Sequence, residues 1–277
     1  MKRIVTAISR IPILILAIIS LLPLVFTLTN SFMQMNEIIR YYGNLREFTP
    51  FHIIPDQFSP AGYYGVLVRH PYFLTAFWNS LFMVVTIVVS QLFVSLLAGY
   101  AFTYFDFRFR NLLFFLVIIL MMMPYQVTLV SNYMVLDRLN LLGGYQSIII
   151  PGLFSAFGVF LLRMIIENIP KEMIDAARVD GANHFRILRS IVIPNCKAGI
   201  VSLVVLSFID CWNMVEQPLV YLKDSSMYPL SIYLTETSQT NYTLGFAGGM
   251  IAMIPVLLLF IFFQDELVEG ISATNLR

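Results

Sequence analysis

The chain has 277 residues, of which 58% are hydrophobic and only 12% are charged, and its formal net charge is +1. An ordinary soluble protein carries about 25% charged residues. The composition therefore excludes a typical soluble protein and predicts an integral membrane protein. We expect contact with membrane lipid and no nucleic-acid partner.

Six apolar stretches are long enough to cross a bilayer as helices. Five of them contain no Asp, Glu, Lys or Arg, and each exceeds the roughly 20 residues that cross about 30 Å of hydrocarbon. The sixth is interrupted by Asp210 and Glu216, but it lies between two clear spans. The expected spans are residues 11–36, 70–105, 111–136, 139–162, 198–222 and 237–264. The prediction is an all-α polytopic fold with a single transmembrane domain over residues 1–277.

The first span resembles a signal peptide in one respect, because Lys2 and Arg3 precede its apolar run. The run is too long for the apolar region of a signal peptide, and residues 28–33 offer no Ala-x-Ala-like cleavage site. We therefore expect an uncleaved membrane anchor.

The distribution of basic residues predicts the orientation. With six crossings both termini lie on one side of the membrane. Twelve of the seventeen Lys and Arg residues lie at the two termini, after the second span and in the loop 163–197. The positive-inside rule then places the termini and this loop in the cytoplasm of a prokaryotic cell. The segment 37–69, which is rich in aromatics, Pro and Gly, is expected outside as a cap of loop and short helix.

The loop 163–197 is longer than a simple connection requires and carries ten charged side chains. Its pattern predicts a short helix that starts at Pro170 and ends before Gly181. A second amphipathic helix is expected over residues 183–193, with Phe185, Leu188 and Ile191 or Val192 on one face, and Pro194 is expected to stop it. The sequence thus predicts two short helices joined at a glycine.

One line of this loop resembles a known motif. Asp175-Ala176-Ala177, three residues, Gly181, nine residues and Ile191-Val192-Ile193-Pro194 are similar to the EAA loop of ABC importer permeases. The family pattern is Glu-Ala-Ala, three residues, Gly, nine residues and Ile-x-Leu-Pro, so the spacing agrees throughout. Asp175 replaces the usual Glu, and Ile193 replaces the usual Leu. In that family the motif is the coupling helix, which docks on a cytoplasmic ATPase.

The residue types also fit docking on physical grounds. Small side chains allow close approach of two backbones, charged ones fix the orientation at the rim of an interface, and glycine permits a sharp change of direction. The alternative is a solvated amphipathic loop that lies on the lipid headgroups. We prefer the docking interpretation, because five elements of the motif match at fixed spacing. The expected coupling residues are Glu172, Asp175, Ala176, Ala177, Arg178, Asp180, Gly181, Ala182, Phe185 and Pro194.

Further stretches resemble the smaller permease subunit of maltose-type transporters, from residue 79 nearly to the end. The resemblance implies the type I ABC importer permease fold, a heterodimer with a second permease, two copies of a cytoplasmic ATPase, an extracytoplasmic solute-binding protein and a sugar substrate. Ser131 departs from this pattern, since such permeases often have Pro there. The stretches are Asn79-Ser80-Leu81, Gly99-Tyr100-Ala101-Phe102, Met123-Pro124-Tyr125-Gln126-Val127, Trp212-Asn213 and Gln217-Pro218-Leu219-Val220-Tyr221-Leu222.

Several polar residues fall inside the expected spans, where a carboxylate facing lipid costs about 3 kcal/mol. On a helical wheel Ser207, Asp210, Asn213 and Gln217 fall within one arc, and Asn79 opens the second span. These five residues are the candidates for a translocation pathway. The alternative is that Asp210 makes a structural hydrogen bond to a neighbouring span, and the sequence leaves both interpretations open.

The sequence contains no G-x-x-x-x-G-K-[S/T] motif, so we expect ATP and Mg²⁺ to be bound by a partner ATPase and no cofactor in this chain. No catalytic residues and no metal site are expected, because His52, His70 and His184 are scattered. One rival is an importer for another solute, such as a polyol or glycerol phosphate. A rival of another class is an ion-coupled carrier that uses Asp210, which predicts paired broken helices in two related halves; the sequence shows no sign of such halves.

Overall fold

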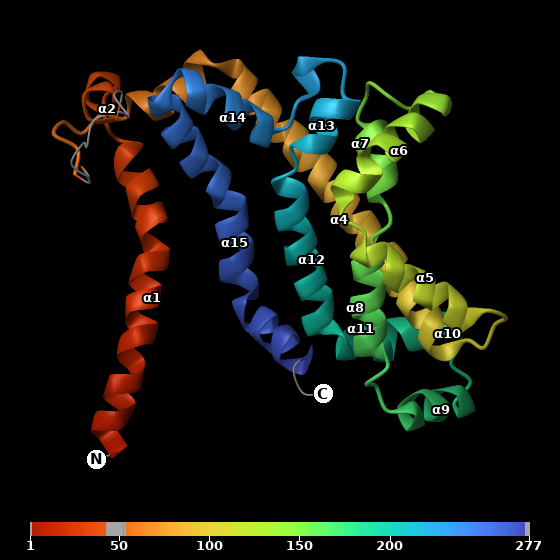
Figure 1. Ribbon diagram of the computed structural model, residues 1–277. Coiled ribbons are helices and arrows are strands. Elements are labelled where there is room, and N and C mark those ends of the chain that lie inside the picture. The colour runs from red at the N-terminus through yellow and green to blue at the C-terminus, as the bar shows by residue number, and fades with distance from the viewer. Residues whose placement is uncertain (1, 43–51, 53, 275–277) are drawn as a thin grey trace. The chain divides into compact units, whose positions relative to one another are not determined.

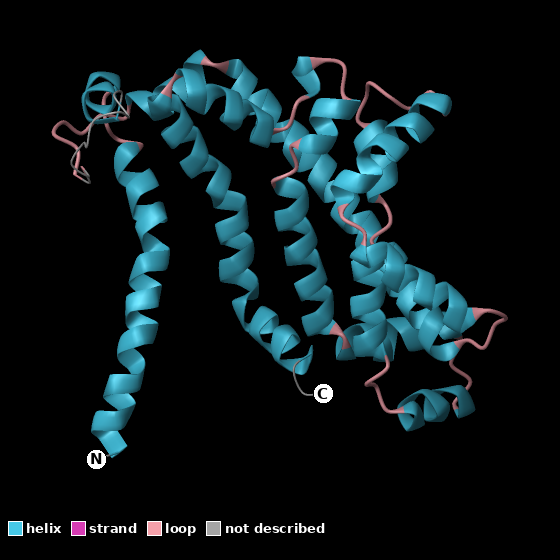
Figure 2. Cartoon of the chain, in the orientation of Figure 1, coloured by secondary structure: helices cyan, strands magenta, loops and turns pink. Residues whose placement is uncertain are grey.

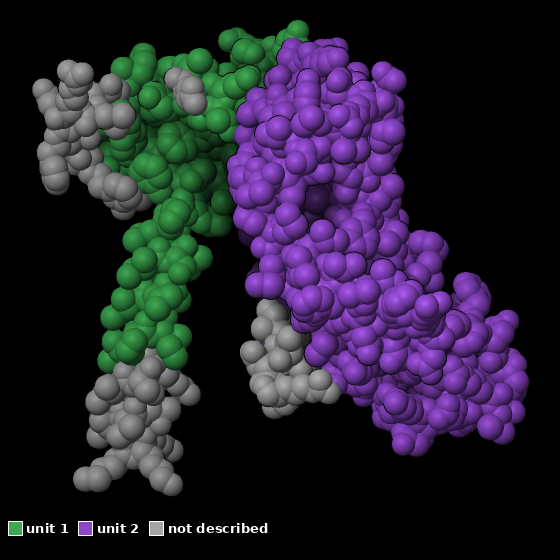
Figure 3. Space-filling model, turned by 45° about the vertical axis from the view of Figure 1, so that its right-hand side comes forward, with its two compact units in different colours: residues 1–77, 232–254 green, residues 78–231, 255–277 purple. Residues whose placement is uncertain are grey.

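The computed structural model describes residues 2–42, 52 and 54–274, and within these residues the only regular elements are helices (Figure 2). The all-α prediction is confirmed. The chain forms two compact units: unit 1 comprises residues 1–77 and 232–254, and unit 2 comprises residues 78–231 and 255–277 (Figure 3).

Unit 1 contains the N-terminal helix and the segment that was expected outside. Its elements are α1 (Lys2–Asn30), α2 (Met35–Tyr42), α3 (Ala61–Tyr64) with a π-helical turn (Gly65–Arg69), the start of α4 (Pro71–Tyr104), most of α14 (Leu230–Thr240) and the first part of α15 (Tyr242–Thr274). The first span thus ends at Asn30, earlier than the expected residue 36. From Ile11 onward the apolar side chains of α1 are mostly exposed, as expected for a helix that faces lipid.

Unit 2 is built around α8 (Ala156–Ile166), which packs against both α5 (Arg110–Met122) and α12 (Lys197–Trp212) (Figure 1). Its other elements are the remainder of α4 and α15, α6 (Tyr125–Arg138), α7 (Gln146–Gly152), α9 (Lys171–Val179), α10 (His184–Ile187), which continues through Leu188–Val192 into α11 (Ile193–Asn195), α13 (Glu216–Tyr221) and a 3₁₀ turn (Ser225–Met227). At one end of unit 2 lie α9 and α10, and at the other lie α6, α7 and α13.

Small residues let α4 approach α8 closely. A Cβ atom at Gly99 would lie 3.0 Å from the backbone nitrogen of Arg163 and 3.3 Å from the carbonyl carbon of Leu162. Backbone atoms cannot give way as a flexible side chain can, so Gly99 is required where the two helices touch. This contact explains physically why a glycine stands in the stretch Gly99-Tyr100-Ala101-Phe102.

We expect Gly99→Val to destabilise the protein by about 1–3 kcal/mol, the usual cost of overpacking a tight contact. Gly249→Val on α15 is the matched control, because nothing lies within 4 Å of a Cβ atom at that position and both changes put the same β-branched residue into a helix. Thermal unfolding in detergent measures the difference. Equal melting temperatures for the two variants would contradict the close contact.

The expected span 111–136 is a broken helix, and a second sharp bend precedes the expected fifth span. Between α5 and α6 the chain bends by 107°, because Pro124 lacks an N–H group and Met123 before it is extended, with φ −74° and ψ 124°. The helical run 184–195 and α12 meet at 78° around Cys196. The prediction of one continuous helix over 111–136 was therefore wrong, and Pro194 lies inside a helix that it was expected to stop.

The fifth span also differs from the prediction. Its helix α12 ends at Trp212, and α13 begins only at Glu216, so residues 198–222 do not form one helix. Four described helices are long and apolar enough to cross a membrane, and the number rises to six if each bent pair is one span. The expected six crossings agree with this upper value.

Candidate functional site

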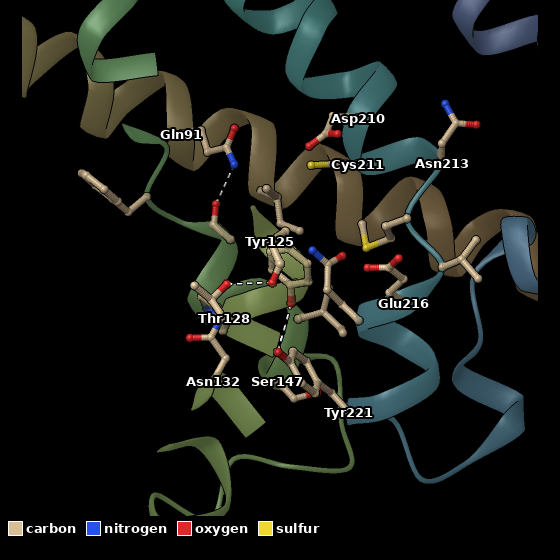
Figure 4. Close-up of a pocket in the computed structure, with 18 of the residues that line it drawn as sticks. Gln91, Tyr125, Thr128, Asn132, Ser147, Asp210, Cys211, Asn213, Glu216 and Tyr221 are labelled. Carbon is tan, nitrogen blue, oxygen red and sulfur yellow. Dashed lines mark hydrogen bonds between the residues drawn. The ribbon is translucent and has the colours of Figure 1, made fainter. Parts of the chain in front are cut away.

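Unit 2 contains a cavity of about 770 Å³ between α4, α6, α7 and the break that separates α12 from α13 (Figure 4). Its lining is mixed: carboxylates from Asp210 and Glu216, side-chain amides such as Gln91, and aromatic rings such as Tyr125 and Tyr221. Such a surface offers donors and acceptors beside flat apolar faces, and it suits a polar solute of moderate size.

The break after α12 brings the two carboxylates to one cavity. Asn213 leaves the helical conformation, and its Nδ2 atom donates a hydrogen bond of 2.8 Å to the carbonyl oxygen of Ile209. The backbone N–H of Asn213 donates to the same carbonyl oxygen at 3.3 Å, so Asn213 closes the last turn of α12 with both its backbone and its side chain. Residues 213–215 then turn, so that Asp210 at the end of α12 and Glu216 at the start of α13 both line the cavity.

Other parts of the cavity wall are held in place by hydrogen bonds. The hydroxyl groups of Tyr125 and Tyr221 lie 3.0 Å apart, and Tyr221 donates to the carbonyl oxygen of Leu129 at 3.1 Å. Gln91 on α4 donates to the carbonyl oxygen of Gly152 at 2.9 Å. With Tyr221 buried, this side of the cavity is a shaped surface made of fixed groups.

The electrostatic character of the cavity follows from its lining. Among the described residues that line it, Asp210 and Glu216 are acidic and none is Lys, Arg or His. No ion pair to either carboxylate forms within the described part of the chain. A cavity with uncompensated negative charge and apolar walls attracts cations and repels anions.

Three of the five predicted pathway residues lie at this cavity: Asp210, Asn213 and Gln217. Gln217 arrives there from α13 and not, as the helical wheel assumed, from the same helix as Asp210. Ser207 is buried in α12 outside the cavity lining. Sequence analysis did not name Glu216 or Tyr125 for this role, although Tyr125 follows the helix-breaking Pro124.

Asn79 does not line the cavity. Its buried side-chain amide donates to the carbonyl oxygens of Ser226 (2.8 Å) and Tyr228 (3.2 Å), and its oxygen accepts from the hydroxyl of Tyr145 at 2.8 Å. These three hydrogen bonds join α4 to the segments that hold Tyr145 and residues 226–228. This geometry gives Asn79 a structural role.

At the other end of unit 2, the loop 163–197 has the two-helix form that the sequence predicted. The first helix, α9, begins after Pro170 and ends before Gly181, whose φ of +79° lies in the left-handed region. The N–H of Ala182 donates back to the carbonyl oxygen of Ala177 at 2.9 Å. The side chain of Asn183 then caps α10 by accepting from the N–H of Arg186 at 2.8 Å.

One face of this loop is anchored to the body of unit 2. Ile174, only 1% exposed, belongs to a buried cluster that includes Ile187 and Val192 as well as residues of α4 and α8. On α4, the hydroxyl of Tyr100 lies 3.0 Å from Nδ1 of His184. The loop helices are therefore packed onto the ends of these two helices and form one body with them.

The opposite face exposes apolar side chains. Val179 is 88% exposed and Phe185 is 72% exposed. The prediction that Phe185 shares a face with Leu188 was wrong: Ile187, not Phe185, is buried beside Leu188 and Val192. Residues that are two positions apart on a helix are rotated by about 200° from one another, so Phe185 points away from the face that holds Ile187. Val179 and Phe185 are thus two large apolar side chains that this part of the loop leaves exposed.

The remaining predicted coupling residues divide between the two faces. Ala177 and Ala182 are half-buried and pack against the chain's own core cluster, so Ala177 is turned inward. The ion pair between Arg178 and Asp175, 3.7 Å, lies on the surface. The exposed members of the set are Glu172, Asp175, Ala176, Arg178, Asp180, Gly181, Phe185 and Pro194.

Known proteins resemble most of this unit in sequence. The family model of the binding-protein-dependent transport system inner membrane component matches residues 91–272, which include the loop and most of the cavity. The arabinooligosaccharides transport system permease protein AraQ of Halalkalibacterium halodurans is 30% identical over 269 residues, which cover 95% of this chain and 93% of the relative. The sn-glycerol-3-phosphate transport system permease protein UgpE of Yersinia pestis is 33% identical over 198 residues, 70% of each chain.

A solved structure shares the fold. The crystal structure of a bacterial ABC transporter involved in the import of the acidic polysaccharide alginate contains a chain that aligns with a TM-score of 0.81, at 24% identity, over 95% of this chain and 96% of that chain. The type I ABC importer permease fold is thereby confirmed, and the family match places the protein in the inner membrane. The chain belongs to the family of inner membrane components of binding-protein-dependent transport systems.

Proposed function

We propose that this chain forms half of the translocation pathway of an ATP-driven importer for neutral oligosaccharides. The observation that carries the proposal is the loop 163–197, in which an EAA-type sequence forms a helix that is anchored on one face and exposes charged and apolar side chains on the other. The exposed face, with Val179 and Phe185, suits a groove on a separate ATPase. The anchored face suits the transfer of that ATPase's movement to α4 and α8.

The proposed assembly contains a second, different permease subunit, two copies of a cytoplasmic ATPase and an extracytoplasmic solute-binding protein. This chain supplies no ATP-binding motif, so hydrolysis, with its Mg²⁺, belongs to the ATPase. The proposal also sets the orientation, with both termini and the loop in the cytoplasm. ATP-driven closure of the ATPases would move the loop and change the side from which the pathway is open.

The cavity supports the choice of solute class. Relatives carry names that refer to arabinooligosaccharides and to sn-glycerol-3-phosphate, so the family includes permeases for neutral and for anionic solutes. The lining of this cavity has two carboxylates and, within the described residues, no basic side chain. An anion would be repelled, whereas the hydroxyl groups of a neutral sugar can donate hydrogen bonds to carboxylates.

The ion-coupled carrier is the rival function. The structure contains two bent helix pairs, with bends of 107° and 78°, which sequence analysis did not foresee. Belonging to a binding-protein-dependent family argues for a driven permease. Asp210 then has no need to act as an ion-coupling site.

Reconstituted transport tests the proposal. The whole complex in proteoliposomes, given its binding protein and labelled neutral oligosaccharides, is expected to take up solute only with ATP. Uptake should stop when the ATPase carries an inactive P-loop and should persist when a protonophore dissipates the proton gradient. Uptake that survives the inactive ATPase and stops with the protonophore would favour the rival.

The exposed face of the loop can be tested separately. Burying a Phe side chain contributes about 1.5–3 kcal/mol, so we expect Phe185→Asp to reduce co-purification of the ATPase at least about tenfold without loss of membrane insertion. Leu139→Asp is the control, because Leu139 is also an exposed apolar residue but lies in the turn after α6, away from the loop. Equal losses in both variants would indicate a general effect of the added charge.

A further inference from the structure

Three potential metal ligands meet in unit 1, and none of them belongs to the cavity lining or to the loop 163–197. Glu37 lies on α2, and His52 and Asp56 lie in the segment that follows it. One ligand atom from each residue can be chosen so that all three lie within 4.8 Å of one another. This cluster is independent of the cavity and of the loop 163–197.

The separations within the cluster fit a small divalent cation. Nε2 of His52 lies 3.6 Å from Oε1 of Glu37 and 3.4 Å from Oδ1 of Asp56. Ligands at about 2.0–2.2 Å from a tetrahedral zinc ion lie about 3.3–3.6 Å from one another. The observed distances are also too long for good hydrogen bonds, so the three groups are close without satisfying one another.

Two polar atoms in the cluster are buried and have no hydrogen-bond partner: Oε2 of Glu37 and Nε2 of His52. The side chain of Glu37 is only 8% exposed. A buried carboxylate oxygen without a partner is costly, because it has lost water and gained nothing in exchange. A cation bound between Glu37 and His52 would remove that cost for both groups.

Neighbouring groups hold the ligands in position, as the hydrogen-bond partners of metal ligands do in known metal sites. The backbone N–H of Asp56 donates to Oε1 of Glu37 at 2.6 Å, and the hydroxyl of Tyr41 donates to Oδ2 of Asp56 at 3.0 Å. The ring of Tyr41 also stacks on the imidazole of His52, with centroids 4.0 Å apart.

We infer that Glu37, His52 and Asp56 form a binding site for Zn²⁺ or a similar borderline divalent cation. One imidazole and two carboxylates are a donor set that zinc accepts in proteins, and water can complete the coordination. Asp56 is 52% exposed, so the ion can enter from solvent. A nearby positive charge would oppose cation binding, and Arg40 lies over the ring of Tyr41 at 5.8 Å. Because Arg40 is exposed, water screens its charge. The bound ion would fasten the segment around residues 52–56 to α2.

The test is metal binding by the whole transporter complex, purified through an affinity tag without histidines and stripped with a chelator. Titration with ZnCl₂ should show one saturable site per copy of this chain. We expect His52→Ala and Glu37→Gln to abolish this site. Tyr41→Phe should weaken Zn²⁺ binding by about 10–100-fold, the usual effect of removing a hydrogen bond to a metal ligand.

The control is His70→Ala, because His70 is an exposed histidine of the same unit outside the cluster. It should bind Zn²⁺ within about twofold of the wild type, and the wild type with Co²⁺ should show visible absorption bands of a protein-bound ion that His52→Ala lacks. The inference is overturned if the wild type binds no more Zn²⁺ than His52→Ala, or if His70→Ala loses as much binding. Transport need not change in either case, so this result and the test of the proposed function are separable.

Discussion

Gly181→Pro is expected to release the ATPase from the transporter while leaving the chain in the membrane. Gly181 has a φ of +79°, whereas proline requires a φ near −65°. Its N–H also donates to the carbonyl oxygen of Arg178 at 3.0 Å, and proline cannot make this bond. The cost, about 3 kcal/mol or more, is relieved by changing the direction of the chain after α9, which moves the docking surface.

The measurement is the amount of ATPase that co-purifies with the tagged permease, which should fall at least about tenfold. Gly181→Asn is the matched control, because asparagine tolerates the left-handed conformation and nothing lies within 4 Å of a Cβ atom at this position. It should retain most of the ATPase. Normal co-purification with Gly181→Pro would show that α9 is not part of the docking surface. Ala177→Arg is a less informative variant, since Ala177 packs against the chain's own core cluster.

Asp210→Leu is expected to lower ATP-driven uptake at least about tenfold while changing assembly little. A tenfold change in rate corresponds to about 1.4 kcal/mol, which the loss of one charged acceptor in a cavity can supply. The side chain lines the cavity without an ion-pair partner in the described structure, so its removal should not unfold α12. Uptake is to be compared with the amounts of ATPase and second permease that co-purify.

Asp137→Leu serves as the control, because Asp137 is an exposed acid on α6 outside the cavity lining. It should keep wild-type uptake. The double variant Asp210→Asn with Glu216→Gln tests the charge directly: it should admit acidic oligosaccharides that the wild type excludes. Wild-type uptake by Asp210→Leu would assign the residue to structure, the alternative that the sequence left open.

The loop could be predicted closely because its signals are local. Pro170 begins a helix and Gly181 ends it, and the left-handed conformation of Gly181 needs no information beyond the residue type and its place after a helix. The buried face was predicted less well, since Phe185 was assigned to it and Ile187 occupies it. A short helix with apolar residues on two sides leaves its inner face to be decided by the surrounding packing.

The cavity was less predictable for a different reason. A helical wheel assumes one unbroken helix, and nothing in residues 213–215 resembles the usual breakers Pro and Gly. The stop at Asn213 depends on its side-chain bond to Ile209 and on the packing of α13. The break at Met123–Pro124 could have been predicted from the proline. It was missed because the residues around it form one long apolar run, which was interpreted as a single span. The cluster of Glu37, His52 and Asp56 carries no spacing motif, and only the folded segment brings these residues together.

The helix α12 joins the two functional ends of unit 2 without interruption. It begins next to the helical run 184–195 of the loop and ends at the residues that border the cavity. Sixteen residues of α-helix measure about 24 Å. It joins the loop at the 78° bend around Cys196, whose side chain is buried. In the proposed assembly, α12 would therefore be the direct covalent connection by which a movement of the loop reaches Asp210 at the cavity wall.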